Sequence, residues 1–284
     1  MARRRSLYGR VAVVTGSTRG LGFALARELG RNGAMVVLAS RSETHVAAAV
    51  RALRDEGLEV SEVRCDTREL DDVEALRDHA QQRGRLDIWV NNAGVAGVYG
   101  PTASTPVDDF ERVIRTNIVG TFHGARVALP VFLEQGSGDL VNLWGQGDNG
   151  PVAMQNAYAS SKRWVRQFTE TLQRETKGTP VRVHGMNPGL VMTDLLGHVT
   201  AQAGYERRLA ALPIVVALWG QTPAVAARPI VGLVTSRRPV YRDLSGAGLV
   251  VRGLRNALSG RLREENRMAL EVTTVPRQER LPVR

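Results

Sequence analysis

Short apolar runs that suit buried strands alternate with helical patterns through most of this chain. The runs are VAVVT, AMVVLAS, LEVSEVRCD, LDIWVNNAG, GDLVNLW and VRVHGMNPG. Stretches with apolar residues at helical spacing, such as 21–32 and 43–56, lie between them. Because strands joined by helices run parallel, this alternation predicts the α/β class, with a doubly wound sheet and helices on both faces.

The alternation weakens after Pro188, in a segment that reads as helices. Thr222 and Pro223 have the order that opens a helix. A segment in this position commonly covers a substrate, so we expect a lid over about 195–222, with the apolar run Leu212–Trp219 at its centre. The same run could instead pack between subunits.

The net charge of +10 is concentrated at the two ends of the chain. Residues 1–10 carry four Arg and no acid, and residues 237–284 carry eleven Arg against five acids. A nucleic-acid-binding domain concentrates basic charge on a folded face, so we expect no nucleic-acid partner. We predict a basic arm over 1–10, one α/β domain over 11–245, and a basic, helical tail over 246–284. The ends are either solvated or in weak contact with an anionic membrane.

Membrane insertion and export are not expected. The run Leu212–Trp219 is far shorter than the roughly 20 residues of a spanning helix, and residues 1–10 lack the apolar core of a signal peptide. We therefore expect a cytoplasmic protein that is at most peripheral to a membrane. Cys65 is the one cysteine in the sequence, which permits no internal disulfide, and no metal site is expected.

A glycine-rich turn, TGSTRGLG, joins the first strand to the first helix. Its glycines allow a tight turn and bring backbone N–H groups and a helix N-terminus close to a pyrophosphate. The spacing differs from the usual dinucleotide fingerprint, and such a turn can need glycine for steric reasons alone. Its position at the first strand–helix junction favours nucleotide binding. The predicted contacts are Gly16, Ser17, Thr18, Arg19, Gly20, Leu21 and Gly22.

The end of the second strand predicts which dinucleotide binds. A site selective for NAD places an acid there to hold the ribose, but this chain has Ser40 and Arg41, with Arg19 in the glycine turn. Two guanidinium groups can hold a 2′-phosphate, so NADPH is favoured over NADH, unless the arginines face solvent. After the third strand, Asp66 and the adjoining Thr67 are candidates for the adenine side. Asp66 could equally cap the helix beginning near Glu69.

The stretch YASSK places Tyr158 and Lys162 four residues apart on one helix face. We expect the Lys162 ammonium to lower the pKa of the Tyr158 phenol from about 10 by about one to three units. Such a phenol could protonate the oxygen of a carbonyl as hydride reaches its carbon.

Five motifs now stand in one order: TGSTRGLG, NNAG at 91–94, Asn117 in RTNIVGTF, YASSK, and NPGLVMT at 187–193. Together they resemble the short-chain dehydrogenase/reductase family over about residues 10–195. The resemblance implies a single Rossmann-type sheet of about seven strands, with NAD(P)H across its carboxyl edge, and a homodimer or homotetramer packed through the helix of Tyr158. It also implies roles for further residues: Asn92, Ala93 and Gly94 on the adenosine side, Lys162 on the nicotinamide ribose, Asn117 beside a water that reaches Lys162, and Pro188, Gly189, Val191 and Thr193 at the nicotinamide amide.

One departure from that family concerns the residue thirteen before Tyr158. Family members place Ser or Thr there as a hydrogen-bond donor to the carbonyl oxygen, and this chain has Gly145. Loss of such a donor costs about 3 kcal/mol, or about a hundredfold in rate. The amide of Gln146 could donate instead. Three interpretations stay open: a reductase with another anchor, a crippled enzyme kept for binding, or a glycine that makes room for a bulky substrate.

A narrower resemblance supports the third interpretation. The stretches NLWGQGDNGPVAMQNAYASSKRWVRQF and VRVHGMNPGLVMTDLL are similar to chlorophyll b reductases, in which glycine also takes that place. The resemblance implies NADPH-dependent reduction of a formyl group to a hydroxymethyl group. We expect Gly145, Gln146, Leu195 and Trp219 to line the substrate site. The alternatives are a reductase or dehydrogenase of another hydrophobic ketone or alcohol, such as a 3-oxoacyl compound, and a non-catalytic NADPH-binding sensor or scaffold.

Overall fold

Seven parallel strands form the central sheet of the computed structural model, which describes residues 6–243, 247–260, 262 and 268–276. Their order is β3-β2-β1-β4-β5-β6-β8, which confirms the predicted sheet. The bounds are β1 Val11–Thr15, β2 Met35–Ser40, β3 Val60–Arg64, β4 Leu86–Asn91, β5 Gly138–Leu143, β6 Val181–Asn187 and β8 Val240–Arg242.

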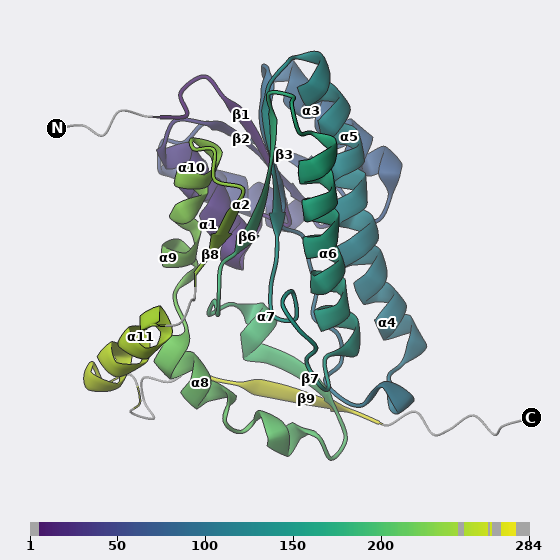
Figure 1. Ribbon diagram of the computed structural model, residues 1–284, viewed down its shortest axis with the longest axis vertical. Helices are drawn as coiled ribbons and strands as arrows, with labels where there is room; N and C mark the ends of the chain where they lie inside the picture. Colours follow the sequence, from purple (N-terminus) through teal and green to yellow (C-terminus); the bar gives the residue numbers. More distant parts are fainter. Residues whose placement is uncertain (1–5, 244–246, 261, 263–267, 277–284) are drawn as a thin grey trace, which may run out of the picture.

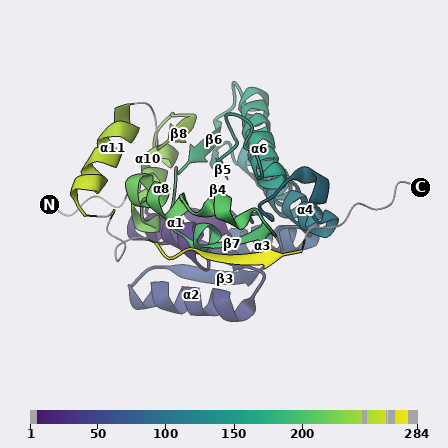
Figure 2. The same cartoon turned by 90° about the horizontal axis from the view of Figure 1, so that it is seen from below.

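Helices cover both faces of this sheet, as the sequence predicts (Figures 1 and 2). One face carries α1 Gly20–Arg31, α2 Glu43–Asp55, α9 Pro223–Ala227 and α10 Pro229–Val234, and the other carries α3 Leu70–Gln82, α5 Gly120–Glu134 and α6 Asn156–Glu175. The short helix α4 Val107–Ile114 leads toward α5. Every residue of β1 is buried: Ala12 and Val14 enter one core, and Val11 and Val13 enter the other. A continuous apolar strand is what a sheet covered on both faces requires.

The connection between β3 and β4 reverses the direction in which the chain builds the sheet. From β1 the chain proceeds outward to β3, and it then returns so that β4 pairs with the opposite side of β1. At such a switch point the loops that follow the two central strands diverge and leave a crevice for a ligand. The glycine turn follows β1 and the NNAG loop follows β4, so both lie at this switch point, where such a crevice is expected.

The segment after β6 is only partly helical. It contains α7 Asp194–Gly197, the strand β7 His198–Gln202, and α8 Leu212–Trp219. β7 pairs in parallel with β9 Glu271–Val275, and Figure 1 shows this pair crossing below the main sheet. The helical interpretation of residues 198–202 was therefore wrong. It could not take account of the partner strand β9, which lies near the C-terminus, about 70 residues further along the chain. Thr222 does cap α9 through its side chain, as expected.

The C-terminal segment contains the predicted helix, α11 Ala247–Leu258. It packs on α8, where the indole nitrogen of Trp219 donates to the Leu249 carbonyl at 3.2 Å and the Asn256 amide donates to the Leu218 carbonyl at 2.7 Å. Residues 1–5, 244–246, 261, 263–267 and 277–284, which include much of the predicted basic ends, lie outside the described residues. Among the described helices, none combines the length and apolarity needed to cross a bilayer.

Candidate active site

The glycine turn after β1 is shaped to receive an anionic group. Gly16 and Gly20 have φ angles of 63° and 56°, which favour glycine, and a β-carbon on Gly22 would lie 2.2 Å from the Gly16 carbonyl oxygen. α1 begins directly at this turn, with no side-chain cap and no acid in its first turn. The positive end of the helix dipole therefore faces the crevice without a competing carboxylate from α1, which fits a pyrophosphate.

The NNAG loop is hydrogen-bonded to this turn. The Asn92 amide nitrogen donates to the carbonyls of Thr15 and Gly16, at 2.9 and 3.1 Å. The Thr15 hydroxyl in turn accepts from the backbone N–H groups of Asn92 and Ala93, each at 3.0 Å. The two loops therefore form one unit at the switch point. This role of Thr15 was not predicted, although a hydroxyl at the last position of a buried strand is a usable signal in the sequence.

Two hydroxyl-bearing residues that were predicted to contact the cofactor are buried in the protein. Ser17 is fully buried, and its hydroxyl accepts from the Ala39 N–H at 3.0 Å, which ties the glycine turn to the end of β2. Thr67 is also buried, with its hydroxyl oxygen 2.7 Å from where a β-carbon on Gly120 would lie. Leu21 packs against the core. These side chains hold the loops of the site in place.

The charged groups near the end of β2 differ in how they are paired. Arg41 is exposed, whereas Arg19 forms an exposed ion pair with Asp194 at 3.2 Å. Arg68, which the sequence analysis did not single out, donates to the carboxylate of Asp66 at 2.6 to 3.0 Å. Burial opposes ionisation of Asp66, but the hydrogen bonds and charge of Arg68 and the charge of Arg41 hold its pKa below the usual value. Asp66 is thus a charged, partnered residue, and α3 begins at Leu70 without a side-chain cap from it.

Tyr158 and Lys162 lie side by side on α6, at the carboxyl ends of the central strands. The Lys162 Nζ is 5.8 Å from the centroid of the Tyr158 ring and donates to the Leu143 carbonyl, at the end of β5, at 3.1 Å. The NNAG loop passes close by, since a β-carbon on Gly94 would lie 3.6 Å from the same Nζ. The structure therefore brings the predicted Tyr–Lys pair and the NNAG loop together at one edge of the sheet.

Asn117 lies in a π-helical turn, Arg115–Val119, between α4 and α5 and is almost fully buried. Its side-chain oxygen accepts from the Val95 N–H at 2.9 Å, and its amide nitrogen donates to the Val95 carbonyl and the Ser161 hydroxyl, both at 3.0 Å. These bonds clamp the loop after β4 onto α6. Such turns often mark functional positions in helices. The expected contact of Asn117 with a water stays a prediction.

The expected lowering of the Tyr158 pKa was wrong. Burial, with a further contribution from the negative charge of Asp148, raises the pKa of Tyr158 to about 12. Burial also lowers the pKa of Lys162 to about 8, against the opposing effect of Asp148. The physical reason is that removal from water disfavours both the phenolate and the ammonium. Near neutral pH the pair therefore consists of a neutral phenol beside an ammonium.

Gly145 is in direct contact with this pair. A β-carbon built on Gly145 would lie 2.7 Å from the Tyr158 hydroxyl oxygen and 3.4 Å from the Lys162 Cγ. The first distance is too short for a carbon–oxygen contact, so the Tyr158 hydroxyl lies in the space that a serine side chain would need. The neighbouring Gln146 is exposed, and its side-chain oxygen accepts from the Gln155 amide at 3.4 Å.

The loop after β6 closes the site from the other side. Gln221 holds this loop by donating from its side chain to the Pro188 carbonyl at 2.6 Å and by pairing with Val191 in an isolated bridge. A β-carbon on Gly189 would lie 2.5 Å from a carboxylate oxygen of Asp243. Thr193 faces the glycine turn, with its methyl group 3.2 Å from where a β-carbon on Gly20 would lie. Gln221 and Asp243, which contact the loop from distant parts of the chain, belong to none of the sequence motifs and were not predicted.

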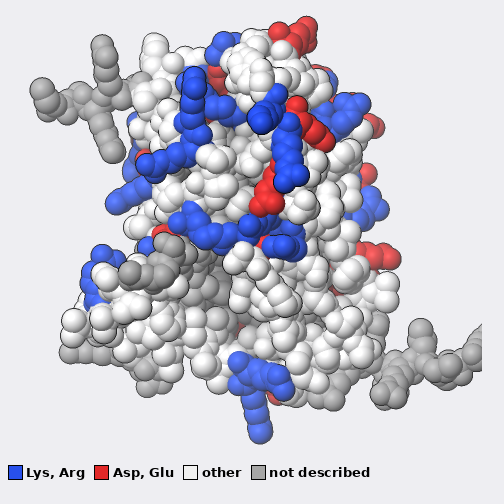
Figure 3. Space-filling model, viewed as in Figure 1, with Lys and Arg blue, Asp and Glu red and all other residues white. Residues whose placement is uncertain are grey.

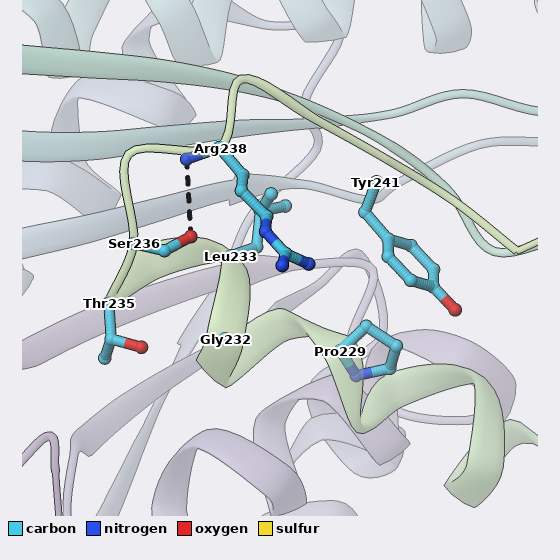
Figure 4. A pocket seen from close by; sticks show the side chains of 7 residues that line it. All are labelled: Pro229, Gly232, Leu233, Thr235, Ser236, Arg238 and Tyr241. Atoms are coloured by element: carbon cyan, nitrogen blue, oxygen red, sulfur yellow. Dashed lines mark hydrogen bonds between the residues drawn. The ribbon is translucent and has the colours of Figure 1, made fainter.

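The predicted substrate residues are only partly brought together. Gly145 adjoins Tyr158, whereas Leu195 on α7 is exposed and the indole nitrogen of Trp219 bonds to α11. A hollow of about 470 Å³ lies elsewhere, between α10 and the strand β8. Figure 4 shows the side chain of Arg238 extending into this hollow, toward the space between Pro229 and Tyr241. None of the residues that line it belongs to the predicted site.

Comparison with known proteins agrees with this geometry. A family model described as short chain dehydrogenase matches residues 10–204. The chlorophyll(ide) b reductase NOL of Arabidopsis thaliana is 38% identical over 245 residues, which span 82% of this chain and 70% of that protein. A putative ketoacyl reductase of Streptomyces coelicolor is 33% identical, over 72% of this chain and 83% of that protein.

A solved structure extends the likeness to nearly the whole chain. A variant of actinorhodin polyketide ketoreductase with NADPH superimposes with a TM-score of 0.72 at 26% identity, covering 97% of this chain and 98% of that one. The glycine turn, the NNAG loop and the Tyr158–Lys162 pair lie within the residues that the family model matches. The chain therefore belongs to the short chain dehydrogenase family.

Proposed function

We propose that this protein is an NADPH-dependent reductase of a carbonyl group, with Tyr158 as the proton donor. The observation that carries the proposal is the placement of Tyr158 and Lys162 beside the NNAG loop, which is itself bonded to the glycine turn. This arrangement sets an acid next to a crevice that fits a dinucleotide. Relatives that are reductases and a structural neighbour solved with NADPH support the same reading.

Tyr158 and Lys162 have different roles in the proposed reaction. The glycine turn and the NNAG loop would hold NADPH, which would supply the hydride for the carbonyl carbon. The Tyr158 hydroxyl gives its proton to the carbonyl oxygen, and the ammonium of Lys162 stabilises the phenolate that remains. A pKa of about 12 keeps Tyr158 protonated at neutral pH, which suits a proton donor better than a base. The carbonyl oxygen therefore becomes the hydroxyl group of the alcohol product.

The substrate that we propose is the formyl group of chlorophyll(ide) b, with a hydroxymethyl product. Two features of the chain favour a wide, flat molecule over a small polar one. Gly145 puts no side chain of its own beside Tyr158, and the apolar helix α8, in which Ile214 is 41% exposed, ends just before Gln221, which bonds to the loop after β6. Figure 3 shows that the region around α8 is mostly uncharged, whereas charged side chains gather on the upper part of the same face.

A second candidate is a 3-oxoacyl ketone, which the similarity to a putative ketoacyl reductase favours. The two candidates separate in one assay. NADPH oxidation at 340 nm is followed with chlorophyllide b and with a panel of simple ketones and 3-oxoacyl thioesters. Turnover of chlorophyllide b with a hydroxymethyl product is the expected result. Turnover of ketones alone would assign the second candidate, and tight NADPH binding without any turnover would indicate a sensor.

The proposed preference for NADPH is tested at Arg41. Loss of a charge-assisted contact to a 2′-phosphate costs about 1.5 to 3 kcal/mol, or about tenfold to a hundredfold in Kd. Arg41→Ala should therefore weaken NADPH by that factor and leave NADH nearly unchanged, as measured by fluorescence titration. Arg41→Lys keeps the charge and should lose less. Arg19→Ala serves as the comparison, because the Arg19 side chain pairs with Asp194. Equal losses of NADPH and NADH in Arg41→Ala would contradict the assignment.

We further propose that the protein acts as a homodimer or homotetramer packed through the outer side of α5 and α6. Phe122 on α5 is 46% exposed and lies 6.3 Å, between ring centroids, from Phe168 on α6, which stacks on Trp164. An exposed aromatic side chain next to half-buried ones favours a partner surface. We also propose that the protein is cytoplasmic and that its basic ends contact an anionic membrane.

A further inference from the structure

Asp148 is a buried acid in the loop that carries Gly145. It lies three residues after Gly145, between β5 and α6, and is only 2% exposed. Its N–H donates to the Gly145 carbonyl at 3.1 Å, so the two residues close one tight turn. A carboxylate is seldom buried without a partner, because its desolvation is costly. Its partners therefore indicate what the residue does.

The carboxylate of Asp148 joins three segments of the active site. Arg242, the last residue of β8, donates to both of its oxygens, at 3.2 and 2.8 Å. The Asn187 amide, at the end of β6, donates to it at 2.9 Å. The Asn187 side-chain oxygen in turn accepts from the Gly189 N–H at 2.9 Å. One side chain thus connects the turn of Gly145 with the loop that closes the site opposite it.

The backbone of Asp148 is held by the helix of Tyr158. Arg163 donates to the Asp148 carbonyl at 2.9 Å, and Arg166 donates to it at 3.5 Å. The guanidinium groups of Arg166 and Arg242 also lie 5.5 and 5.7 Å from the ring centroid of Trp144, the residue before Gly145. The turn is therefore fastened to α6, β6 and β8 together.

We propose that Asp148 is a positioning residue for the reaction: with Arg242 and Asn187 it fixes the Gly145 turn and the loop after β6 relative to Tyr158 and Lys162. This inference rests on the proposed reductase function for its kinetic consequence, but its geometric and electrostatic parts do not. A turn that places no side chain of its own beside Tyr158 needs outside support to keep its backbone in position. The bidentate pair with Arg242 supplies that support.

The ion pair of Asp148 and Arg242 also determines part of the electrostatic field at Tyr158 and Lys162. The charged and titratable groups of this region are Tyr158, Lys162, Arg163 and Arg166 from α6, with Glu170 paired to Arg166, Asp148 from the loop, and Arg242 from β8. The negative charge of Asp148 raises the pKa of Lys162, whereas burial lowers it more strongly. Removal of the carboxylate should therefore lower the pKa of Lys162. Removal of Arg242, which offsets that carboxylate, should raise it.

The experiment compares Asp148→Asn with Arg242→Gln. The sequence has only two lysines, Lys162 and the exposed Lys177, so a chain labelled with 13Cε-lysine gives two signals that can be titrated by NMR. We expect Lys162 to titrate near pH 8 in the wild type, lower in Asp148→Asn and higher in Arg242→Gln. Lys177 should not move in either variant. In steady-state assays both variants should lose about tenfold to a hundredfold in kcat, with little change in KM for NADPH.

Opposite shifts are the result that a merely structural role would not produce. Asp78→Asn is the matched control, since Asp78 is an exposed acid paired with Arg77 on α3, and it should change neither readout. Unchanged titration of Lys162 in both variants, or shifts in the same direction, would overturn the proposal. If Asp148→Asn does not fold, an upward shift in Arg242→Gln still supports the proposal and an unchanged titration refutes it. The titration needs no turnover, so opposite shifts in a protein that reduces no carbonyl would reject the reductase function and leave the electrostatic role of Asp148 intact.

Discussion

Tyr158→Phe is expected to lower carbonyl reduction by about 10²- to 10⁴-fold while NADPH still binds with nearly the wild-type Kd. The substitution removes the hydroxyl and keeps the aromatic ring of this α6 residue. No other hydroxyl takes over easily, because the residue facing Tyr158 across the site is Gly145. Turnover is measured from NADPH oxidation at 340 nm, and binding from the fluorescence of NADPH.

The control for that variant is another tyrosine. Tyr8→Phe removes the same atom from a side chain that is 79% exposed and outside the site, so its kcat should equal that of the wild type. Wild-type turnover in Tyr158→Phe would show that the proton comes from elsewhere. Loss of NADPH binding in parallel with turnover would show instead that Tyr158 acts mainly in shaping the cofactor site.

Gly145→Ser should lower the rate, although it restores the hydroxyl that family resemblance leads one to expect. A β-carbon at this position would lie 2.7 Å from the Tyr158 hydroxyl oxygen, so Tyr158 must shift before any serine fits. Displacement of a reacting group by about 1 Å can cost about a hundredfold in rate. We expect a loss of tenfold to a hundredfold, about the magnitude that a new donor could contribute in the opposite direction.

The sign of the Gly145→Ser effect therefore decides between the interpretations of the missing serine. Gly145→Ala adds the same β-carbon without the hydroxyl, and it should lose activity to a similar degree. Gly150→Ser is the control, because a β-carbon at Gly150 meets nothing within 4 Å. A faster Gly145→Ser enzyme would mean that the site is a crippled version of one that used serine, and that the glycine has no spatial purpose.

The fold could be predicted from local patterns because the strands are buried on both faces. β1 begins with four apolar residues and β4 contains the apolar run 88–90, and the helix α6 places Tyr158 and Lys162 on one face as their spacing requires. The pairing of β7 with β9 could not be predicted in the same way. Both strands are short, and neither carries a pattern that identifies its partner.

Within the site, the sequence predicted which loops meet better than it predicted what each side chain does. Ser17 stands in the glycine turn as expected, yet its hydroxyl bonds to Ala39 of β2. The ammonium of Lys162 lies beside Tyr158, yet burial and the negative charge of Asp148 raise the phenol pKa. Burial and the partner of a buried group depend on segments far apart in the chain, as with Asp148 and Arg242.

The most direct test of the account follows a label from the cofactor to the product. NADPH carrying deuterium at both C4 positions of the nicotinamide is given to the enzyme with chlorophyllide b, and the product is analysed by mass spectrometry. The account predicts one deuterium in the new hydroxymethyl group for every NADPH oxidised, with this product lost in Tyr158→Phe. Oxidation of NADPH without deuterium in the product, or full labelling in Tyr158→Phe, would contradict it.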